Sequence, residues 1–368
     1  MIVSCTQENL AKGLGLVGRS VGTRTTLPVL NNILIKTEKG RLKLSATDLE
    51  IGIHTWVGAK VDEEGALTIP AKLLLDYINT NNDKTIDFSA KDLTLHLKSE
   101  HYKANIKGID AAEFPLIPEV KKAESLEIPV ASFLNAITKT LISTALDESR
   151  PVLAGVFFKA KGNTLKMVAT DSYRLSEQTV ILNKKIDNEV VFIVPQKTLA
   201  EVGRILSNAG EVVIVSAGEN QVEFKLGETI LVSRLIEGTF PDYEQIIPKT
   251  VKTTVVVKAS LFSNAIKMAS LFARESANNI KLKIEAPDKV SVLAVSPHLG
   301  DNTSEITGQV SGEGIEIAFN AKFLSDVLAV INSENVKLEL SSNLAAGLIK
   351  AEKDNNFLYV IMPLRVDE

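Results

Sequence analysis

The sequence predicts an α+β protein of three repeated domains, each with two helices packed on mostly antiparallel strands. Three segments support the repeat, because each runs from a short apolar strand into an amphipathic helix; they span residues 68–78, 192–206 and 317–331. The lysines that open these helices, Lys72, Lys197 and Lys322, recur at an interval of 125 residues. A fixed period with matching flanks indicates an internal triplication.

The length of 368 residues agrees with three domains, since one hydrophobic core rarely organises so long a chain. We place the domains at residues 1–124, 125–250 and 251–368. Other landmarks keep the same frame: the Thr-Asp of Asp48 returns at Asp171, and the Phe-Pro of Pro115 returns at Pro241. The third copy has Ser296 at the first of these positions, so functional elements are expected to differ between copies.

A second helix is predicted at the start of each copy, at residues 8–21, 131–144 and 259–273. In the first, Leu10, Leu14 and Val17 follow the i, i+4, i+7 spacing of a buried helix face. Alternating apolar and polar residues lie between the helices and are bounded by Gly, Asn and Asp, as in the run RLKLSAT. This pattern is typical of antiparallel strands with one buried face.

The composition excludes several classes of protein. Apolar residues form 45% of the chain and are mixed with 23% charged residues, which excludes a disordered or collagen-like polymer. The first residues lack a basic flank followed by an apolar run, and no run of 18 uncharged apolar residues occurs. We therefore expect an unexported cytoplasmic protein with no membrane partner. Cys5 is the single cysteine and the four histidines are scattered, so no disulfide, metal or other cofactor is expected.

No catalytic motif is found. Residues 13–18 match the pattern GxGxxG, but no βαβ unit follows, and we interpret these glycines as a close approach on a helix. Asp48 and Asp171 end predicted strands and have no partner histidine, so we interpret them as turn residues whose carboxylates accept backbone hydrogen bonds. The sequence also lacks a Walker loop, a G-x-S-x-G and an HExxH motif. The protein is not expected to be an enzyme.

Basic residues recur on the predicted helices although the formal net charge is −4. They are Lys12, Arg19, Lys139, Lys267 and Arg274 on the first helices and Lys72, Lys197, Arg204 and Lys322 on the second. Binding to duplex DNA depends on cations that neutralise phosphates. Positive helices in an acidic protein therefore predict a segregated surface, with one basic face and an acidic remainder.

Nine short motifs, taken in order, resemble the bacterial DNA polymerase III beta subunit, the sliding clamp. They are TLPVLNNILI, LSATDLEI, IPAK, DAAEFPLIP, RPVLAGVFF, VATDSYRL, IVPQK, GTFPDYEQIIP and YVIMPLRV. The resemblance implies a head-to-tail homodimer whose six domains form a closed ring, each protomer being half of it, with paired helices lining a channel around duplex DNA. Contacts with phosphates would be independent of sequence, because base readout would prevent sliding.

The resemblance implies three sets of functional residues. For DNA we expect Arg24 on a loop and Lys12, Lys72, Lys139, Lys197, Arg204, Lys267 and Lys322 on the helices. In the second domain, Asp147 and Glu148 put a corresponding loop contact in doubt. For the homodimer we expect Ile106 of one protomer to pack against Leu271 and Phe272 of the other.

The third set is an apolar pocket for short linear peptides of the replicative polymerase, the clamp loader and repair proteins. It comprises Leu153, Thr170, Ser172, Tyr173, Arg174, Leu175, Pro241, Ile246, Val360, Met362, Pro363, Leu364 and Arg365. Met362 is flexible and polarizable, which suits a pocket for several ligands. Tyr173 replaces a common histidine and Leu364 a common methionine, so the peptide preference is open. The alternatives are a triplicated scaffold that never meets DNA, and an enzyme acting on nucleotides, which would need clustered acidic or histidine ligands.

Overall fold

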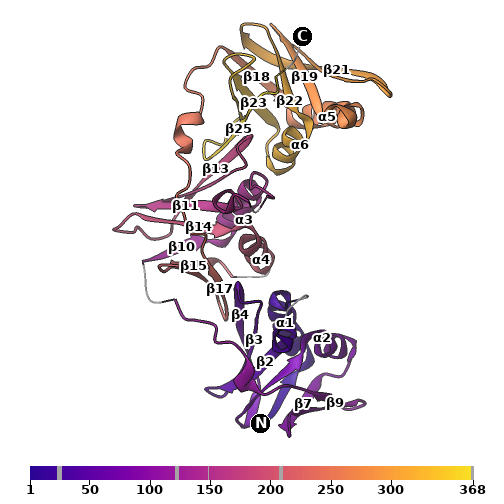
Figure 1. Ribbon diagram of the computed structural model, residues 1–368, viewed down its shortest axis with the longest axis vertical. Coiled ribbons are helices and arrows are strands. Elements are labelled where there is room, and N and C mark those ends of the chain that lie inside the picture. The colour runs from indigo at the N-terminus through magenta and orange to yellow at the C-terminus, as the bar shows by residue number, and fades with distance from the viewer. Residues whose placement is uncertain (23–26, 121–123, 148, 207–209, 366–368) are drawn as a thin grey trace. The chain divides into compact units, whose positions relative to one another are not determined.

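The chain folds into two compact units, and each unit combines parts of two repeats (Figure 1). The computed structural model describes residues 1–22, 27–120, 124–147, 149–206 and 210–365. Unit 1 contains Met1–Ala131 and Lys197–Leu235, and unit 2 contains Ser132–Gln196 and Ile236–Glu368.

Unit 1 contains two antiparallel sheets. The smaller has the strand order β5 (Lys60–Glu63), β1 (Ile2–Thr6), β7 (Thr85–Lys91), β8 (Thr94–Lys98), β9 (Lys103–Lys107). The larger has the order β10 (Ser125–Pro129), β15 (Val212–Ala217), β16 (Gln221–Leu226), β17 (Thr229–Arg234), β4 (Ile51–Val57), β3 (Arg41–Thr47), β2 (Asn32–Glu38), β6 (Ala66–Pro70). Because β17 pairs with β4, one sheet continues from the first repeat into the second.

Unit 2 repeats this arrangement with a sheet of twelve strands. Their order is β14 (Val190–Pro195), β11 (Gly155–Lys161), β12 (Thr164–Thr170), β13 (Arg174–Ile181), β25 (Phe357–Ile361), β24 (Gly347–Ala351), β23 (Asn335–Leu340), β18 (Thr253–Lys258), β21 (Gly300–Gly312), β20 (Lys289–Ser296), β19 (Asn279–Glu285), β22 (Ile315–Asn320). Here β13 of the second repeat pairs with β25 of the third. The last strand of the chain is thereby fixed beside residues nearly two hundred positions earlier.

Two helices per repeat are confirmed in the described part of the chain. They are α1 (Gln7–Val17) and α2 (Ala71–Thr80), α3 (Val130–Leu141) and α4 (Gln196–Leu206), α5 (Ala259–Ala273) and α6 (Ala321–Val330). Leu10, Leu14 and Val17 are buried, as their spacing predicts, and each contributes about 1.5–3 kcal/mol by burial. In unit 2, Phe262 of α5 and Leu324 of α6 belong to one buried core.

Gly13 of α1 and Gly18, which directly follows that helix, allow close packing, as the sequence predicts. A Cβ on Gly13 would lie 2.5 Å from Val57 Cγ2, and one on Gly18 would lie 2.7 Å from Leu75 Cδ1. Both distances are too short for real atoms, so α1 can approach β4 and α2 only because these positions lack side chains. Gly15 has open space around it.

Burial of His54 on β4 makes the stability of unit 1 depend on pH. Burial, assisted by the charge of Lys43, lowers the pKa of His54 from 6.5 to about 4, and Nδ1 lies 2.8 Å from Ser45 Oγ. Between these pH values the unfolded chain binds a proton that the folded chain does not. The free energy of unfolding should therefore fall by about 1–3 kcal/mol as the pH drops from 6.5 to 4. Urea denaturation across this range should show a smaller fall for His54→Gln, and an equal fall would contradict the assignment.

Candidate functional site

The residues predicted to bind peptides come together in unit 2, where the last strand meets the second repeat. Strand β25 pairs with β13 so that Val360 lies opposite Leu175. The pairing continues past the strand, because the Met362 backbone N–H donates to the Tyr173 carbonyl at 2.8 Å. The Leu364 N–H then donates to the Ala318 carbonyl at 2.8 Å. The motifs VATDSYRL and YVIMPLRV are thus adjacent in space although far apart in sequence.

An apolar base lies under this junction. Leu153, Leu175 and Val360 are buried in one cluster, together with Phe240 and Tyr243. The rings of Phe157 and Phe240 stack with centroids 4.8 Å apart. Phe240 and Tyr243 are not among the predicted residues, although the repeated Phe-Pro pair was a signal that could have found Phe240. Burial of the base keeps the surface above it in a fixed shape.

The exposed edge of this surface carries large apolar side chains. Tyr173 is 61% exposed and Met362 is 39% exposed, and Ile246 is also exposed. Pro241 and Arg365 are exposed, while Pro363 and Leu364 are half-buried. Exposed apolar groups that adjoin a rigid apolar base are typical of a protein-binding surface. We call the thirteen predicted residues, from Leu153 to Arg365, the unit 2 surface.

The turn between β12 and β13 positions Tyr173. The Thr170 hydroxyl donates to the Arg174 carbonyl at 2.7 Å, and Asp171 Oδ1 accepts the backbone N–H groups of Tyr173 at 2.9 Å and Arg174 at 3.0 Å. Ser172 has a left-handed φ of 80° and accepts a hydrogen bond from Arg150 Nη1 at 3.0 Å. Asp171 therefore has the structural role in a turn that the sequence predicts. Thr170, with its buried hydroxyl, also shapes the surface from beneath.

Arg174 differs from its predicted role as a peptide contact. Its Nε donates to Asp171 Oδ2 at 2.9 Å and its Nη1 to Asp326 Oδ2 at 2.6 Å. The guanidinium also lies 4.3 Å from the ring centroid of Phe323, and the residue is buried. Arg174 thus links the turn to α6. Asp326 and Phe323 were missed because nothing in their local sequence marks them.

The predicted DNA-binding cations have three different environments. Lys12, Lys72 and Lys267 are exposed on α1, α2 and α5, and no ion pair engages them among the described residues. Lys322 shares Asp326 with Arg174, at 3.2 Å, and Arg204 pairs with Glu201. Arg24 lies outside the described residues. The first three lysines are therefore the best-placed cations for phosphates.

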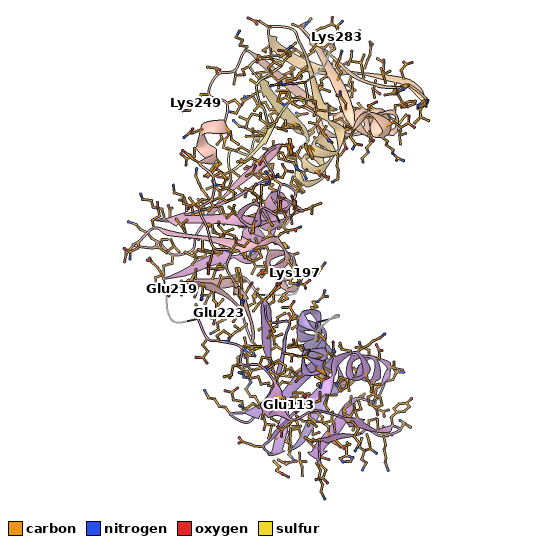
Figure 2. The ribbon with its side chains drawn as sticks, viewed as in Figure 1. Glu113, Lys197, Glu219, Glu223, Lys249 and Lys283 are labelled. Atoms are coloured by element: carbon orange, nitrogen blue, oxygen red, sulfur yellow. The ribbon has the colours of Figure 1, made fainter. Side chains whose placement is uncertain are left out.

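Lys197 at the start of α4 is held by carboxylates of unit 1. Its Nζ lies 3.0 Å from Asp48 Oδ2 and 3.5 Å from Glu50 Oε2. The hydrogen bond to Asp48 and the charges of both carboxylates raise the pKa of Lys197. This lysine remains charged, but much of its charge is offset locally. In the same unit, Glu219 and Glu223 lie on the other side of the sheet from α4 (Figure 2).

Lys139 corrects the predicted DNA surface. It is only 5% exposed, its Nζ donates to Asp354 Oδ2 at 2.9 Å, and it lies 4.8 Å from the ring centroid of Phe357. The aliphatic part of the side chain is buried in unit 2, and its ammonium group binds a carboxylate of the same unit. Lys139 is therefore a structural residue, and its place on an amphipathic helix gave no sign of this.

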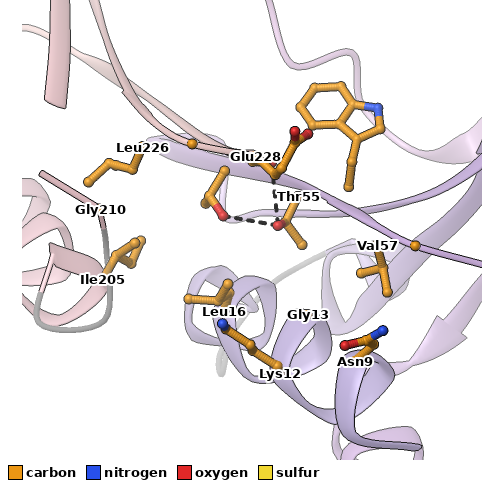
Figure 3. Close-up of a pocket in the computed structure, with 14 residues that line it drawn as sticks. Asn9, Lys12, Gly13, Leu16, Thr55, Val57, Ile205, Gly210, Leu226 and Glu228 are labelled. Atoms are coloured by element: carbon orange, nitrogen blue, oxygen red, sulfur yellow. Dashed lines mark hydrogen bonds between the residues drawn. The ribbon is translucent and has the colours of Figure 1, made fainter. Parts of the chain in front are cut away.

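Helices α1 and α4 lie over the same face of the larger unit 1 sheet, because residues of both line one pocket (Figure 3). The pocket has a volume of about 360 Å³ and lies between Lys12 and Leu16 of α1 and Ile205 of α4. On its strand side, the hydroxyls of Thr55 and Thr229 are 2.9 Å apart across the β4–β17 ladder. The predicted helical face is thus continuous across the junction of the first two repeats.

Comparison with known proteins agrees with the repeat along the whole chain. Models of the DNA polymerase III beta subunit match in order: the N-terminal domain at residues 1–118, the central domain at 127–242 and the C-terminal domain at 244–365. The chain belongs to this family. Its function is that of a sliding clamp, a non-catalytic processivity factor of DNA replication.

Relatives from several bacteria support this assignment. The beta sliding clamp of Synechocystis is 32% identical over 390 residues, with both chains fully covered. That of Staphylococcus epidermidis is 30% identical, with 94% of each chain covered. The crystal structure of the DNA polymerase sliding clamp from Bacillus subtilis has a TM-score of 0.96 at 27% identity, and that of the Pseudomonas aeruginosa beta subunit has 0.95 at 28%, each covering both chains fully. The predicted sliding clamp fold and family are confirmed.

The residues predicted for the clamp homodimer are only partly exposed. Leu271 on α5 is 48% exposed and Phe272 is half-buried against the unit 2 core. Ile106 is 4% exposed, because β9 alternates and this residue faces the core. The expectation that the Ile106 side chain reaches a partner is therefore corrected. In the same unit, the exposed apolar residues Leu73 and Tyr102 line a pocket of about 350 Å³.

One group of possible metal ligands occurs among the described residues. Asp83, Glu100 and His101 are close enough to hold an ion. The Asp83 carboxylate, however, already lies 2.7 Å from His101 Nδ1 and accepts a hydrogen bond from the His101 backbone N–H at 2.9 Å.

Within the described residues, no helix is long and apolar enough to cross a membrane.

Proposed function

We propose that two copies of this chain join head to tail into a closed ring around duplex DNA in the cytoplasm. The ring holds the replicative polymerase, the clamp loader and repair proteins through short linear peptides that bind the unit 2 surface. Its repeat domains are residues 1–124, 125–250 and 251–368. Duplex DNA is bound without sequence specificity, chiefly by Lys12, Lys72 and Lys267.

The observation that carries ring closure is a pair of open strand edges. Among the described residues, strand β9 is the last strand of the five-stranded sheet and pairs there with β8 alone. In β21, residues 300–307 pair with β20 and only residues 308–312 pair with β18, so the first part has one free edge. Free edges are templates for pairing with another chain. A head-to-tail dimer would join these two edges.

The charges on the two edges support the same pairing. Lys103 and Lys107 are exposed on β9, whereas Asp301 and Glu305 are exposed on β21. Side chains an even number of residues apart share one face of a strand, so the two lysines lie on one face of β9 and the two carboxylates on one face of β21, where Glu305 also pairs with Lys289 at 2.7 Å. Opposite charges on paired strands stabilise each pair by about 0.2–1 kcal/mol. Edge pairing would also bring the apolar residues Leu73 and Tyr102 of one protomer near Leu271 and Phe272 on α5 of the other.

A charge placed in this interface should separate the protomers. Leu271→Asp should give folded monomers, because an unpaired carboxylate cannot be buried without a cost of several kcal/mol. Leu261 is the matched control, since it lies on the same helix with 45% exposure but about 15 Å along the axis and about 80° around it from Leu271. Native mass spectrometry should find dimers for the unaltered protein and for Leu261→Asp. Monomers of the unaltered protein at micromolar concentration would rule out the ring.

A further inference from the structure

The turn between β3 and β4 in unit 1 has the same hydrogen bonds as the turn that positions Tyr173 in unit 2. The Thr47 hydroxyl donates to the Ile51 carbonyl at 2.9 Å and accepts the Leu49 N–H at 3.0 Å. Asp48 Oδ1 accepts the N–H groups of Glu50 at 3.1 Å and Ile51 at 2.8 Å. The equivalent distances in the turn of residues 170–174 are 2.7, 3.1, 2.9 and 3.0 Å.

The strand beside each turn is also placed in the same way. The Arg234 N–H donates to the Glu50 carbonyl at 3.1 Å, as the Met362 N–H does to Tyr173 at 2.8 Å. The third residue of each turn has a left-handed φ, 75° for Leu49 and 80° for Ser172. Unit 1 therefore has its own copy of the turn and strand that lie under the unit 2 surface. We call this arrangement the frame, and in unit 1 it is formed by the first two repeats.

This frame borders a pocket of about 230 Å³ in unit 1. Its apolar lining includes Leu49, Leu116, Ile117 and Val232, and Leu116 is almost fully exposed. Part of the space is filled by the chain itself, because a Cβ on Gly52 would lie 2.6 Å from Ile117 Cγ2. The remaining pocket is smaller than a typical ligand site and fits one or two side chains of an extended segment.

The edge of this pocket carries an exposed arginine. Arg234 is exposed in the place that Met362 has in unit 2, and among the described residues no ion pair engages its guanidinium. The acidic residue of the lining, Glu50, shares Lys197 with Asp48, at 3.5 and 3.0 Å, so its charge is partly offset. A ligand that places a carboxylate beside an apolar side chain would complement both the lining and Arg234.

We propose that this pocket is a second peptide-docking site, which takes an apolar side chain followed by an acidic residue. The inference rests on the proposed docking of peptides at the unit 2 surface, whose frame it repeats. It adds a second site to each protomer, and the two sites differ in charge. A partner with two such segments could then engage one protomer at both sites, which strengthens binding through effective concentration.

Methyl NMR of the full-length protein can observe the two sites separately. The probe is the peptide acetyl-Ala-Leu-Leu-Asp-amide, and its charge-reversed control ends in lysine instead of aspartate. We expect the probe to shift the methyl signals of Leu49, Leu116, Ile117 and Val232. Arg234→Glu should weaken binding of the aspartate peptide at these methyls about fivefold and strengthen that of the lysine peptide, as for an exposed ion pair.

Arg365→Glu is the matched control, because it reverses an exposed charge of the unit 2 surface and should leave the unit 1 shifts unchanged. Shifts confined to the methyls of Leu153, Leu175 and Val360 would overturn the second site and leave the unit 2 surface standing. Unit 1 shifts that do not respond to Arg234→Glu would also overturn it, since the carboxylate would then not be recognised. Tighter binding of the lysine peptide than of the aspartate peptide to the unaltered protein would likewise overturn the second site.

Discussion

A ring loaded on a nicked circular plasmid should remain there through a high-salt wash and be lost when one restriction cut makes the plasmid linear. Direct phosphate contacts weaken steeply with salt, by about a thousandfold or more between 50 and 200 mM for six to ten contacts. A closed ring keeps the DNA inside even when those contacts are lost. Release should therefore depend on whether the DNA has ends. Equal rates of release from circular and linear DNA would contradict enclosure.

A charge variant separates enclosure from electrostatic attraction. Replacing Lys12, Lys72 and Lys267 with alanine removes the predicted DNA-binding cations that are exposed on helices and have no ion pair among the described residues. Direct binding to DNA and the efficiency of loading should fall, and the dependence of binding on salt should become shallower. Retention of rings already loaded on circular DNA should hardly change. Lys139→Ala should instead lower stability, because it leaves Asp354 without its partner.

Truncating the exposed edge of the unit 2 surface should nearly abolish binding of a peptide from the replicative polymerase. Tyr173→Ala together with Met362→Ala removes the two large side chains that stand above the apolar base. Each truncation should cost about 1–2 kcal/mol of binding free energy, so affinity should fall roughly thirty- to a thousandfold in the double variant. Fluorescence anisotropy with a labelled peptide measures this directly.

Ile181→Ala is the matched control for this experiment. Ile181 ends β13, the strand that Tyr173 precedes, and it is 54% exposed compared with 61% for Tyr173. It lies outside the thirteen residues of the unit 2 surface, so its truncation should leave peptide affinity unchanged. Unchanged affinity in the double variant, or an equal loss in the control, would place peptide binding elsewhere.

Because Asp171 makes several hydrogen bonds under the unit 2 surface, substituting it alone would have more than one effect. Asp171 binds two backbone N–H groups with one oxygen and Arg174 with the other. Replacing it would change the turn, the link to α6 and the position of Tyr173 at once. A loss of affinity in such a variant would therefore not show that Asp171 contacts a peptide.

The sequence by itself determined the repeat, the two helices of each repeat and the family, because all three depend on periodicity and on short motifs that local chemistry fixes. The glycines of α1 and the turn aspartates Asp48 and Asp171 were also predictable. A glycine in a helix commonly allows close packing, and a carboxylate after a strand commonly accepts backbone hydrogen bonds in a turn. The structure shows the first at Gly13 and Gly18 and the second at both turns.

Only the tertiary structure decided which side chains are available to a partner. Lys139 was predicted to bind DNA and Arg174 to line the peptide pocket, yet each is buried on a carboxylate from a distant segment, Asp354 or Asp326. Ile106 faces its own core, and sheets that continue across the repeats join strands such as β4 and β17. Long side chains reach several ångströms from their helix, so whether a charge meets solvent or a carboxylate depends on contacts between residues far apart in the chain. Local sequence contains no record of those contacts.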